Sequence, residues 1–192
     1  MSKRMYILAG CNGAGKTTAS KELIPAVLNA KTFVNADEIA FQLSPFRPES
    51  VAIQAGRIML TQIQELLSLR ESFAFETTLS AKSYTSIIRK AKILGYEVTL
   101  ILMWLNSVEL AIERVATRVL EGGHHIPTET IKRRHKAGIQ NLFQIYLPIV
   151  DNFMIFDSTN SIPVPIAHKF IDESIIITNP LKWHQLKQSQ QG

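Results

Sequence analysis

Residues 5–20, MYILAGCNGAGKTTAS, decide the fold, because a short apolar run turns there into a glycine-rich loop and then into a helix-forming stretch. The specified positions of the pattern G-x-x-x-x-G-K-[ST] are filled by Gly10, Gly15, Lys16 and Thr17. Glycines at 10, 13 and 15 let the backbone adopt positive φ and approach a ligand, so that successive N–H groups can face phosphate oxygens. The sequence therefore predicts a phosphate-binding loop between a strand and a helix. The alternative, a plain glycine-rich turn, would not require these two flanking elements.

The side chains at the end of this loop have the chemistry needed to hold a nucleotide triphosphate. The Lys16 ammonium is a compact charge that can reach the β- and γ-phosphates, and the Thr17 hydroxyl can complete the shell of a Mg²⁺ ion. The positive end of the following helix, expected over 18–27, adds to the same field. The residues expected to contact the nucleotide are Gly10, Asn12, Gly13, Ala14, Gly15, Lys16, Thr17 and Thr18.

The composition of the 192 residues is typical of one globular domain spanning 1–192, with 46% hydrophobic and 19% charged residues. A net charge of +5 favours anionic ligands, and nucleotide phosphates already account for it, so we expect no nucleic-acid partner. The longest apolar run, 98–105, is far too short to cross a bilayer, so we expect no membrane partner. The single cysteine, Cys11, agrees with a reducing compartment, and we expect it to be a small residue fitted into the loop. These features predict a cytoplasmic protein.

A carboxylate follows the short apolar strand expected over 31–35, KTFVN. Side chains at the carboxyl end of a strand beside the phosphate loop lie in the crevice where open α/β sheets bind ligands. Asp37 is therefore a candidate general base that takes the proton from an acceptor hydroxyl during phosphoryl transfer. The alternative is that Asp37 caps the helix expected over 38–43. The sequence leaves these two roles open.

Two further acidic residues end apolar strands. Glu76 lies within SFAFETTLS at 72–80, where it is either a ligand of Mg²⁺ or its water shell, or a hydrogen-bond acceptor for substrate hydroxyls. Hydroxyls follow it at the start of the next expected helix, where they either contact substrate or cap that helix; they belong to Thr77, Thr78 and Ser80. Asp157 ends the strand expected over 150–156, and we expect it to contact a nucleotide base or a lid.

Strand and helix patterns alternate along the chain, which predicts an α/β fold of the P-loop NTPase type with a mostly parallel sheet flanked by helices. The most continuously apolar strand is expected over 96–105, as for a strand buried on both faces. Long helices are expected over 49–69 and 81–94, and edge strands within 162–178. The polar end of the chain, 187–192, is expected to fray.

An arginine-rich helical pair is expected over about 107–147. Arg114 and Arg118 lie on one face of its first helix, and the second helix carries Arg133 and Arg134. Glycines and a proline within 122–127 form a flexible turn between them. Two such helices predict a lid that closes cations over a transferring γ-phosphoryl group. The alternative is a surface hairpin with solvated charges.

Five motifs together resemble the zeta-toxin family of P-loop kinases, and in particular its short members. They are GCNGAGKTT at 10–18, VNADEIA at 34–40, FETTLS at 75–80, RVATRVLEGGHHIPTETIKRRH at 114–135 and FDSTN at 156–160. The first motif is shared by many nucleotide-binding proteins, whereas the stretches 34–40 and 114–135 are much more specific. Their order along the chain is the order of the family.

The resemblance implies transfer of the γ-phosphate of ATP to a hydroxyl, with Mg²⁺ as cofactor. It implies that Lys16 and Thr17 hold phosphate and metal, and that Asp37 is the general base. The resemblance further implies that Glu76 contacts the acceptor, and we expect the same of Thr77 beside it. The expected phosphoryl-stabilising residues are Arg118 and Arg134, with Arg114 and Arg133 as alternatives.

The family resemblance leaves the acceptor open. In the toxins it is a UDP-linked amino sugar, but full toxins are longer, and the additional segments include parts of the acceptor site. Other possible acceptors are a nucleoside, an antibiotic hydroxyl or a nucleic-acid end. A different hypothesis is that the protein is not an enzyme of this kind but a regulatory module that binds the nucleotide without an acceptor. The resemblance also suggests that an antitoxin-type protein is a partner.

Overall fold

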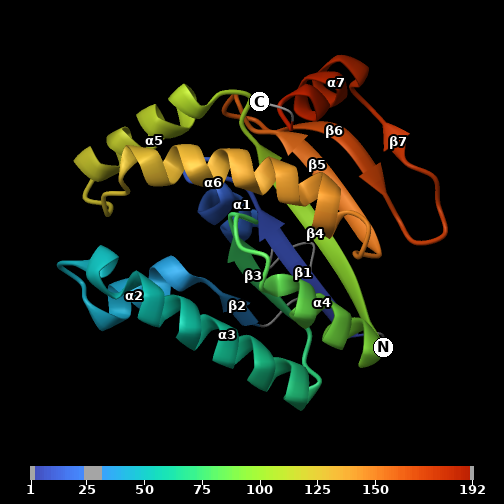
Figure 1. Cartoon of the computed structure of the whole chain (residues 1–192), viewed down its shortest axis with the longest axis horizontal. Helices are drawn as coiled ribbons and strands as arrows, with labels where there is room; N and C mark the ends of the chain where they lie inside the picture. Colours follow the sequence, from blue (N-terminus) through green and yellow to red (C-terminus); the bar gives the residue numbers. More distant parts are fainter. Residues whose placement is uncertain (1–2, 24–31, 191–192) are drawn as a thin grey trace.

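A computed structural model describes residues 3–23 and 32–190 and shows a twisted sheet with helices on both faces (Figure 1). The seven strands lie in the order β2-β3-β1-β4-β5-β6-β7, in which β1 to β5 pair in parallel and β6 and β7 pair antiparallel. The predicted α/β class with a mostly parallel sheet is therefore confirmed. The strands are β1 Lys3–Ala9, β2 Thr32–Val34, β3 Phe73–Thr77, β4 Tyr96–Trp104, β5 Asn152–Asp157, β6 Val164–Lys169 and β7 Ile176–Ile177.

Apolar side chains cover both faces of the sheet because the residues of each strand alternate in direction. In β1, Met5 and Ile7 belong to one buried cluster, whereas Tyr6 and Leu8 belong to the other. The helices that bury these faces are α1 Lys16–Leu23, α2 Ala36–Leu43, α3 Ala52–Leu69, α4 Tyr84–Ile93, α5 Val108–Leu120, α6 Thr128–Asn141 and α7 Pro180–Gln188. Among the described residues, every helix is too short or too polar to cross a membrane.

Several expected boundaries shift. The helix expected over 18–27 begins at Lys16, and its last four residues lie outside the described part of the chain. The helix expected over 49–69 divides into a 3₁₀ turn, Pro48–Val51, and α3. Helix α4 begins at Tyr84 rather than at 81, so Thr78 and Ser80 lie in the turn before it, whereas Thr77 is the last residue of β3. The expected edge strands are confirmed as β6 and β7.

The last helix, α7, was not predicted, and it reaches into the segment expected to fray. Its start has a recognisable local signal, because the Asn179 side chain accepts a hydrogen bond from the N–H of Lys182 and Pro180 occupies the first turn. Leu186 is fully buried against the core. Burial of this one apolar face explains why the helix forms in an otherwise polar sequence.

Helices α5 and α6 form the predicted arginine-rich pair and run side by side in Figure 1. They are packed onto the body of the protein, because Ala111, Val115 and Ile131 are buried in the core on that face of the sheet. After α6, a π-helical turn, Leu142–Tyr146, leads to β5. The lid function of these helices stays a prediction.

The C-terminal end of α6 is fixed to the turn between β3 and α4. The Asn141 side-chain amide donates to the carbonyl oxygens of Leu79, at 2.8 Å, and Ser80, at 3.2 Å. The Tyr146 hydroxyl donates to the carbonyl oxygen of Ala81. A Cβ atom on Gly138 would lie only 2.5 Å from the carbonyl oxygen of Thr78, so the two segments touch backbone to backbone. Helix α6 therefore supports this turn directly.

Candidate active site

The predicted phosphate-binding loop connects β1 to α1. Its glycines have φ values of 148° at Gly10, 80° at Gly13 and 79° at Gly15, which other residues rarely adopt. Gly13 is also close to α5, since a Cβ atom there would lie 2.8 Å from the carbonyl oxygen of Ala111. The loop conformation expected from the sequence is thus present, with the N-terminus of α1 behind it.

Lys16 and Glu76 form a buried pair beside this loop. The Lys16 ammonium donates to the carbonyl oxygen of Cys11 at 2.8 Å and lies 3.4 Å from Glu76 Oε1. The pair forms because β3 is the parallel neighbour of β1 and aligns Glu76 with Leu8, one residue before the strand ends. The other carboxylate oxygen, Oε2, accepts from Thr17 Oγ1 at 3.4 Å. Glu76 therefore faces both the lysine and the hydroxyl of the phosphate-binding loop.

The electrostatic setting of Glu76 is unusual for a carboxylate. Its side chain is only 9% exposed, and this burial raises the pKa of Glu76 above its usual value. The nearby charge of Asp37 also raises the pKa, whereas the Lys16 ammonium and the Thr17 hydroxyl lower it. Its position agrees with both predicted roles, toward a metal shell and toward substrate.

Asp37 lies at the start of α2, but it is not the residue that caps this helix. The Asn35 side-chain oxygen accepts a hydrogen bond from the N–H of Asp37 at 2.8 Å, so Asn35 is the N-cap. The capping role considered for Asp37 is therefore wrong. Its carboxylate is 45% exposed and lies 3.8 Å from Nε2 of His124 in the α5–α6 turn. The side chain is free to meet a ligand from the cavity.

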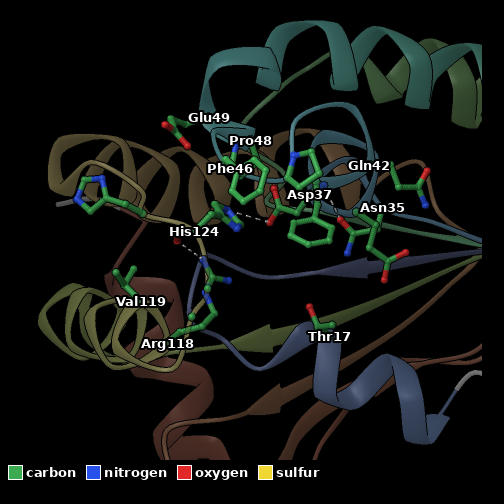
Figure 2. A pocket seen from close by; sticks show the side chains of 16 residues that line it. Thr17, Asn35, Asp37, Gln42, Phe46, Pro48, Glu49, Arg118, Val119 and His124 are labelled. Atoms are coloured by element: carbon green, nitrogen blue, oxygen red, sulfur yellow. Dashed lines mark hydrogen bonds and ion pairs between the residues drawn. The ribbon is translucent and has the colours of Figure 1, made fainter.

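Two cavities meet at Asn35 and Asp37. The larger, of about 760 Å³, opens between α2 and the α5–α6 turn, and Figure 2 shows Asp37, Arg118 and His124 around it. The smaller, of about 200 Å³, lies nearer the phosphate-binding loop. Its polar lining includes Lys16, Asp37, Glu76, Thr78, Ser80 and Arg134. Groups predicted separately from four motifs thus line one continuous region.

A third cavity, of about 430 Å³, lies on the other side of the phosphate-binding loop. Its lining combines the loop and α1 with the segment that follows β5, including Gly15, Thr18, Arg114, Phe156, Ser158 and Asn160. Of the FDSTN motif, Phe156, Ser158 and Asn160 therefore line this cavity. Arg114 Nη1 and Nη2 donate to the carbonyl oxygens of Ser158, at 2.9 Å, and Thr159, at 2.7 Å.

The Asp157 side chain itself points to a different partner. It accepts hydrogen bonds from Thr159 and lies 3.0 Å from the ammonium of Lys182 in α7. Burial acts to raise the pKa of Asp157, but the Thr159 and Lys182 contacts outweigh it and lower the pKa. The carboxylate thus anchors α7, a partner that lies in the unpredicted helix.

The arginines of the predicted lid fall into different environments. Arg134 Nη1 donates to Asn12 Oδ1 at 3.1 Å, directly above the phosphate-binding loop, and burial lowers its pKa. Arg118 Nη2 donates to the carbonyl oxygen of His124 at 3.4 Å, and its buried Nε has no hydrogen-bond partner among the described residues. The Arg114 guanidinium donates to backbone carbonyl oxygens, and the Arg133 side chain is exposed. Arg118 and Arg134 are therefore the two that line the cavities around Asp37.

Thr77 and Cys11 have local partners. Thr77 is buried, and its hydroxyl accepts a hydrogen bond from the N–H of Leu79 at 3.1 Å, which supports the turn after β3. Thr77 also lines the smaller cavity, so its predicted contact with substrate stays a prediction. Burial raises the pKa of the Cys11 thiol to about 11, so the thiol is protonated at neutral pH.

Sequence reasoning missed the role of Asn35 and the partner of His124. Asn35 was interpreted only as the end of a strand because the helix was expected to begin at 38, whereas α2 begins at Ala36, directly after Asn35, where Asn is a favoured cap. The histidines of the turn between the two arginine-bearing helices, His124 among them, were expected only to form hydrogen bonds at that turn. The contact of His124 with Asp37 joins segments 87 positions apart that meet only through the fold.

This sheet order, with a phosphate-binding loop after β1 and carboxylates at the ends of neighbouring parallel strands, defines a P-loop kinase fold. Comparison with known families gives a more specific assignment. The model of the zeta toxin family matches residues 1–163, and the chain belongs to this family.

Individual relatives agree with this assignment. An uncharacterized protein of Haemophilus influenzae is 31% identical over 135 residues, which cover 70% of this chain and 94% of that protein. A chain in the crystal structure of AvrRxo1-ORF1:AvrRxo1-ORF2 with sulphate ions aligns with a TM-score of 0.82 and 19% identity, covering 98% of this chain. This chain spans 65% of the length of that one. The same complex has been crystallised with ATP and aligns with a TM-score of 0.78.

A third relative is from the PezAT chromosomal toxin–antitoxin system of Streptococcus pneumoniae. It aligns with a TM-score of 0.64 and 17% identity over 99% of this chain and 85% of that chain. At these identities the solved structures establish a shared fold.

Proposed function

We propose that this protein is an ATP-dependent kinase that transfers a γ-phosphoryl group to a hydroxyl of a small molecule. The observation that carries the proposal is the position of Asp37, whose carboxylate is released from helix capping and lies where two cavities meet beside the phosphate-binding loop. A free carboxylate next to a phosphate site is the group that phosphoryl transfer to an alcohol requires as a base.

The donor side is supported by the phosphate-binding loop and the cavity beside it. Lys16 would hold the β- and γ-phosphates, and the 430 Å³ cavity has the volume of a site for the base and sugar. The hydroxyl of Thr17 and a carboxylate oxygen of Glu76, 3.4 Å apart, are the oxygen donors that Mg²⁺ prefers. When bound, Mg²⁺ would neutralise charge on the phosphates.

The acceptor side is supported by the charges around the two cavities that meet at Asp37. Asp37 would accept the proton of the attacking hydroxyl, while Arg118 and Arg134 would face the charge on the transferred phosphoryl group. Because the family phosphorylates a UDP-linked amino sugar in its toxin members, this acceptor is the first to test. Nucleosides and antibiotic hydroxyls are the next.

The decisive experiment is mass spectrometry of a metabolite extract incubated with the protein, ATP and Mg²⁺. New phosphorylated species are expected with the wild-type protein. Asp37→Asn should abolish their formation while leaving ATP affinity nearly unchanged, because the change removes a base without altering the loop. A matched control is Glu129→Gln, which removes an exposed carboxylate of α6 that pairs with Lys132. Unaltered turnover in Asp37→Asn would contradict the assignment, and ATP binding without any product would favour the regulatory module.

The proposed roles of the two arginines have their own test. Arg118→Ala and Arg134→Ala should lower kcat more than they weaken ADP binding, because their partner is a group present only during transfer. Equal losses in kcat and in ADP affinity would mean that these arginines only bind the nucleotide.

We also propose an antitoxin-type protein partner and a cytoplasmic location as parts of this function. The relative from Streptococcus pneumoniae belongs to a toxin–antitoxin system, which supports the first. Expression with the product of a neighbouring gene, followed by affinity purification, would test it, and growth of cells at full expression of the free protein would speak against toxicity.

A further inference from the structure

One buried amide joins the Glu76 carboxylate to the backbone of Asp37. The Asn35 side chain, 5% exposed, lies between the end of β2 and the start of α2. Its Nδ2 atom donates to Glu76 Oε2 at 3.1 Å, and its Oδ1 atom accepts from the N–H of Asp37 at 2.8 Å. Each polar end of the amide is therefore used by a different catalytic candidate.

The chemistry of the amide fixes this orientation. Because the N–H of Asp37 is a donor, only the oxygen end of Asn35 can face it, and the nitrogen end must then face an acceptor. Glu76 Oε2 is that acceptor. Of the residue types favoured at an N-cap, asparagine alone offers both an acceptor for the helix and an NH₂ donor for a carboxylate.

We propose that Asn35 is a positioning residue, which holds the Glu76 carboxylate and the start of the Asp37-bearing helix in a fixed relation around the transferred phosphoryl group. The inference rests on the proposed kinase function. Three groups donate to the Glu76 carboxylate or neutralise it: Lys16 and Thr17 from α1, and Asn35 from the segment before α2. Of these, only Asn35 lies outside the phosphate-binding loop and its helix.

Removal of the Asn35 donor has a predictable geometric consequence. The Glu76 carboxylate would keep its contacts with Lys16 and Thr17, which belong to α1, and would lose its hydrogen bond to the segment before α2. The Asp37-bearing helix could then shift relative to Glu76 and Lys16. Because phosphoryl transfer depends on the relative position of these groups, we expect the rate of transfer to fall more than the affinity for nucleotide.

The variants Asn35→Asp and Asn35→Ser separate this role from helix capping. Both residues are good N-caps, so the start of α2 should be preserved. Asn35→Asp replaces the NH₂ donor by an acceptor that faces Glu76, and Asn35→Ser removes the donor without adding charge. The matched controls are Asn179→Asp and Asn179→Ser, which change the N-cap of α7 in the same way where the amide oxygen accepts from Lys182.

The first readout compares the rate of product formation from ATP, Mg²⁺ and the metabolite extract with the affinity for ADP. We expect the rate to fall roughly tenfold in Asn35→Ser, the effect of one lost hydrogen bond to a charged group. It should fall further in Asn35→Asp, which places a second carboxylate against Glu76. The affinity for ADP should stay within about twofold of the wild-type value. The Asn179 variants should retain the wild-type rate and affinity. Equal losses of rate and affinity, or an unchanged rate in both Asn35 variants, would overturn the inference.

The second readout needs no kinase activity. In ligand-free protein labelled with ¹⁵N, the side-chain NH₂ signal of Asn35 can be assigned from its loss in Asn35→Ser. Because this group donates to Glu76, its exchange with solvent should be slow in the wild type and faster in Glu76→Ala, and equal exchange rates would overturn the inference. Product formation by the wild type together with equal exchange rates would defeat this inference alone. Slow exchange in the wild type without any product would defeat the kinase proposal and still support the Asn35–Glu76 contact.

Discussion

Two glycines that lie inside helices should respond to alanine in opposite directions. Gly56 lies in α3 and Gly138 in α6. Alanine should favour both helices by about 0.5–1 kcal/mol, because it restricts the unfolded chain more than glycine does. A Cβ atom at 56 would meet nothing within 4 Å, whereas one at 138 would lie 2.5 Å from the carbonyl oxygen of Thr78. The two substitutions are thus matched in chemistry and differ in their surroundings.

The expected magnitudes follow from these distances. The obstacle at 138 is backbone, so it cannot rotate away, and α6 and the turn after β3 must separate. Overpacking of this kind costs about 1–3 kcal/mol. With a cost of about 2 kcal/mol, the middle of that range, and the helix gain subtracted, Gly138→Ala should be destabilised by about 1–1.5 kcal/mol, whereas Gly56→Ala should be stabilised by about 0.5–1 kcal/mol. For a chain of this length the two melting temperatures should differ by roughly 3–10 °C.

Urea denaturation followed by circular dichroism measures both free energies of unfolding, and thermal scans give the melting temperatures. An unchanged m-value would show that the denatured state is not the source of the difference. If Gly138→Ala proved as stable as Gly56→Ala, the close contact between α6 and Thr78 would not exist in solution. The account of α6 as a support for the active-site turn would then fail with it.

Three shorter predictions concern other contacts of the site. Arg114→Lys should lower the free energy of unfolding by about 1–3 kcal/mol and should also weaken ATP binding. The reason is that one ammonium cannot replace a guanidinium that donates to the carbonyl oxygens of Gly13, Ser158 and Thr159. An unchanged unfolding curve would contradict this prediction. Burial lowers the pKa of His124, so at neutral pH it is uncharged, and its protonation in acid should pair it with Asp37. The variant His124→Asn should then lose less kcat/KM than the wild type as the pH is lowered. Because burial raises the pKa of the Cys11 thiol to about 11, Cys11 should react with iodoacetamide at pH 8 only in the unfolded protein. Mass spectrometry of the alkylated protein measures the rate of this reaction.

The parts of the site that the sequence predicted are those governed by local pattern and by one rule of sheet geometry. The loop at 10–17 has a fixed spacing, and the ends of β1 and β3 meet because parallel neighbours present their carboxyl ends at one edge. For that reason Glu76 could be predicted to face metal or substrate without a structure. Its pairing with Lys16 was not predicted, because it depends on β3 being the direct neighbour of β1.

The parts that the sequence did not predict depend on such partners. Asp157 was assigned to the base or the lid because it comes late in the chain and is followed by the loop at 158–160. Its partner Lys182 belongs to a helix that packs through a buried leucine, Leu186. The second role of Asn35 was missed for a related reason. Its capping of α2 involves only neighbouring residues, whereas its hydrogen bond to Glu76 joins residues 41 positions apart. Contacts between distant residues are decided by packing, which no local pattern records.

Packing limits how the predicted lid can move. Arg114 and Arg134 contact the phosphate-binding loop at Gly13 and Asn12. Their helices bury Ala111, Val115 and Ile131 in the core, and Asn141 ties α6 to the turn after β3. Burial of one large apolar side chain is worth about 1.5–3 kcal/mol, so lifting both helices as one body would cost several times the thermal energy. The turn at 121–127 is exposed over much of its length, and its contacts with Arg118 include the carbonyl oxygen of His124, which accepts from the guanidinium, and the N–H of Gly123, which donates to the Arg118 backbone. Closure over a phosphoryl group should therefore involve this turn and the Arg118 side chain, while α5 and α6 keep their places.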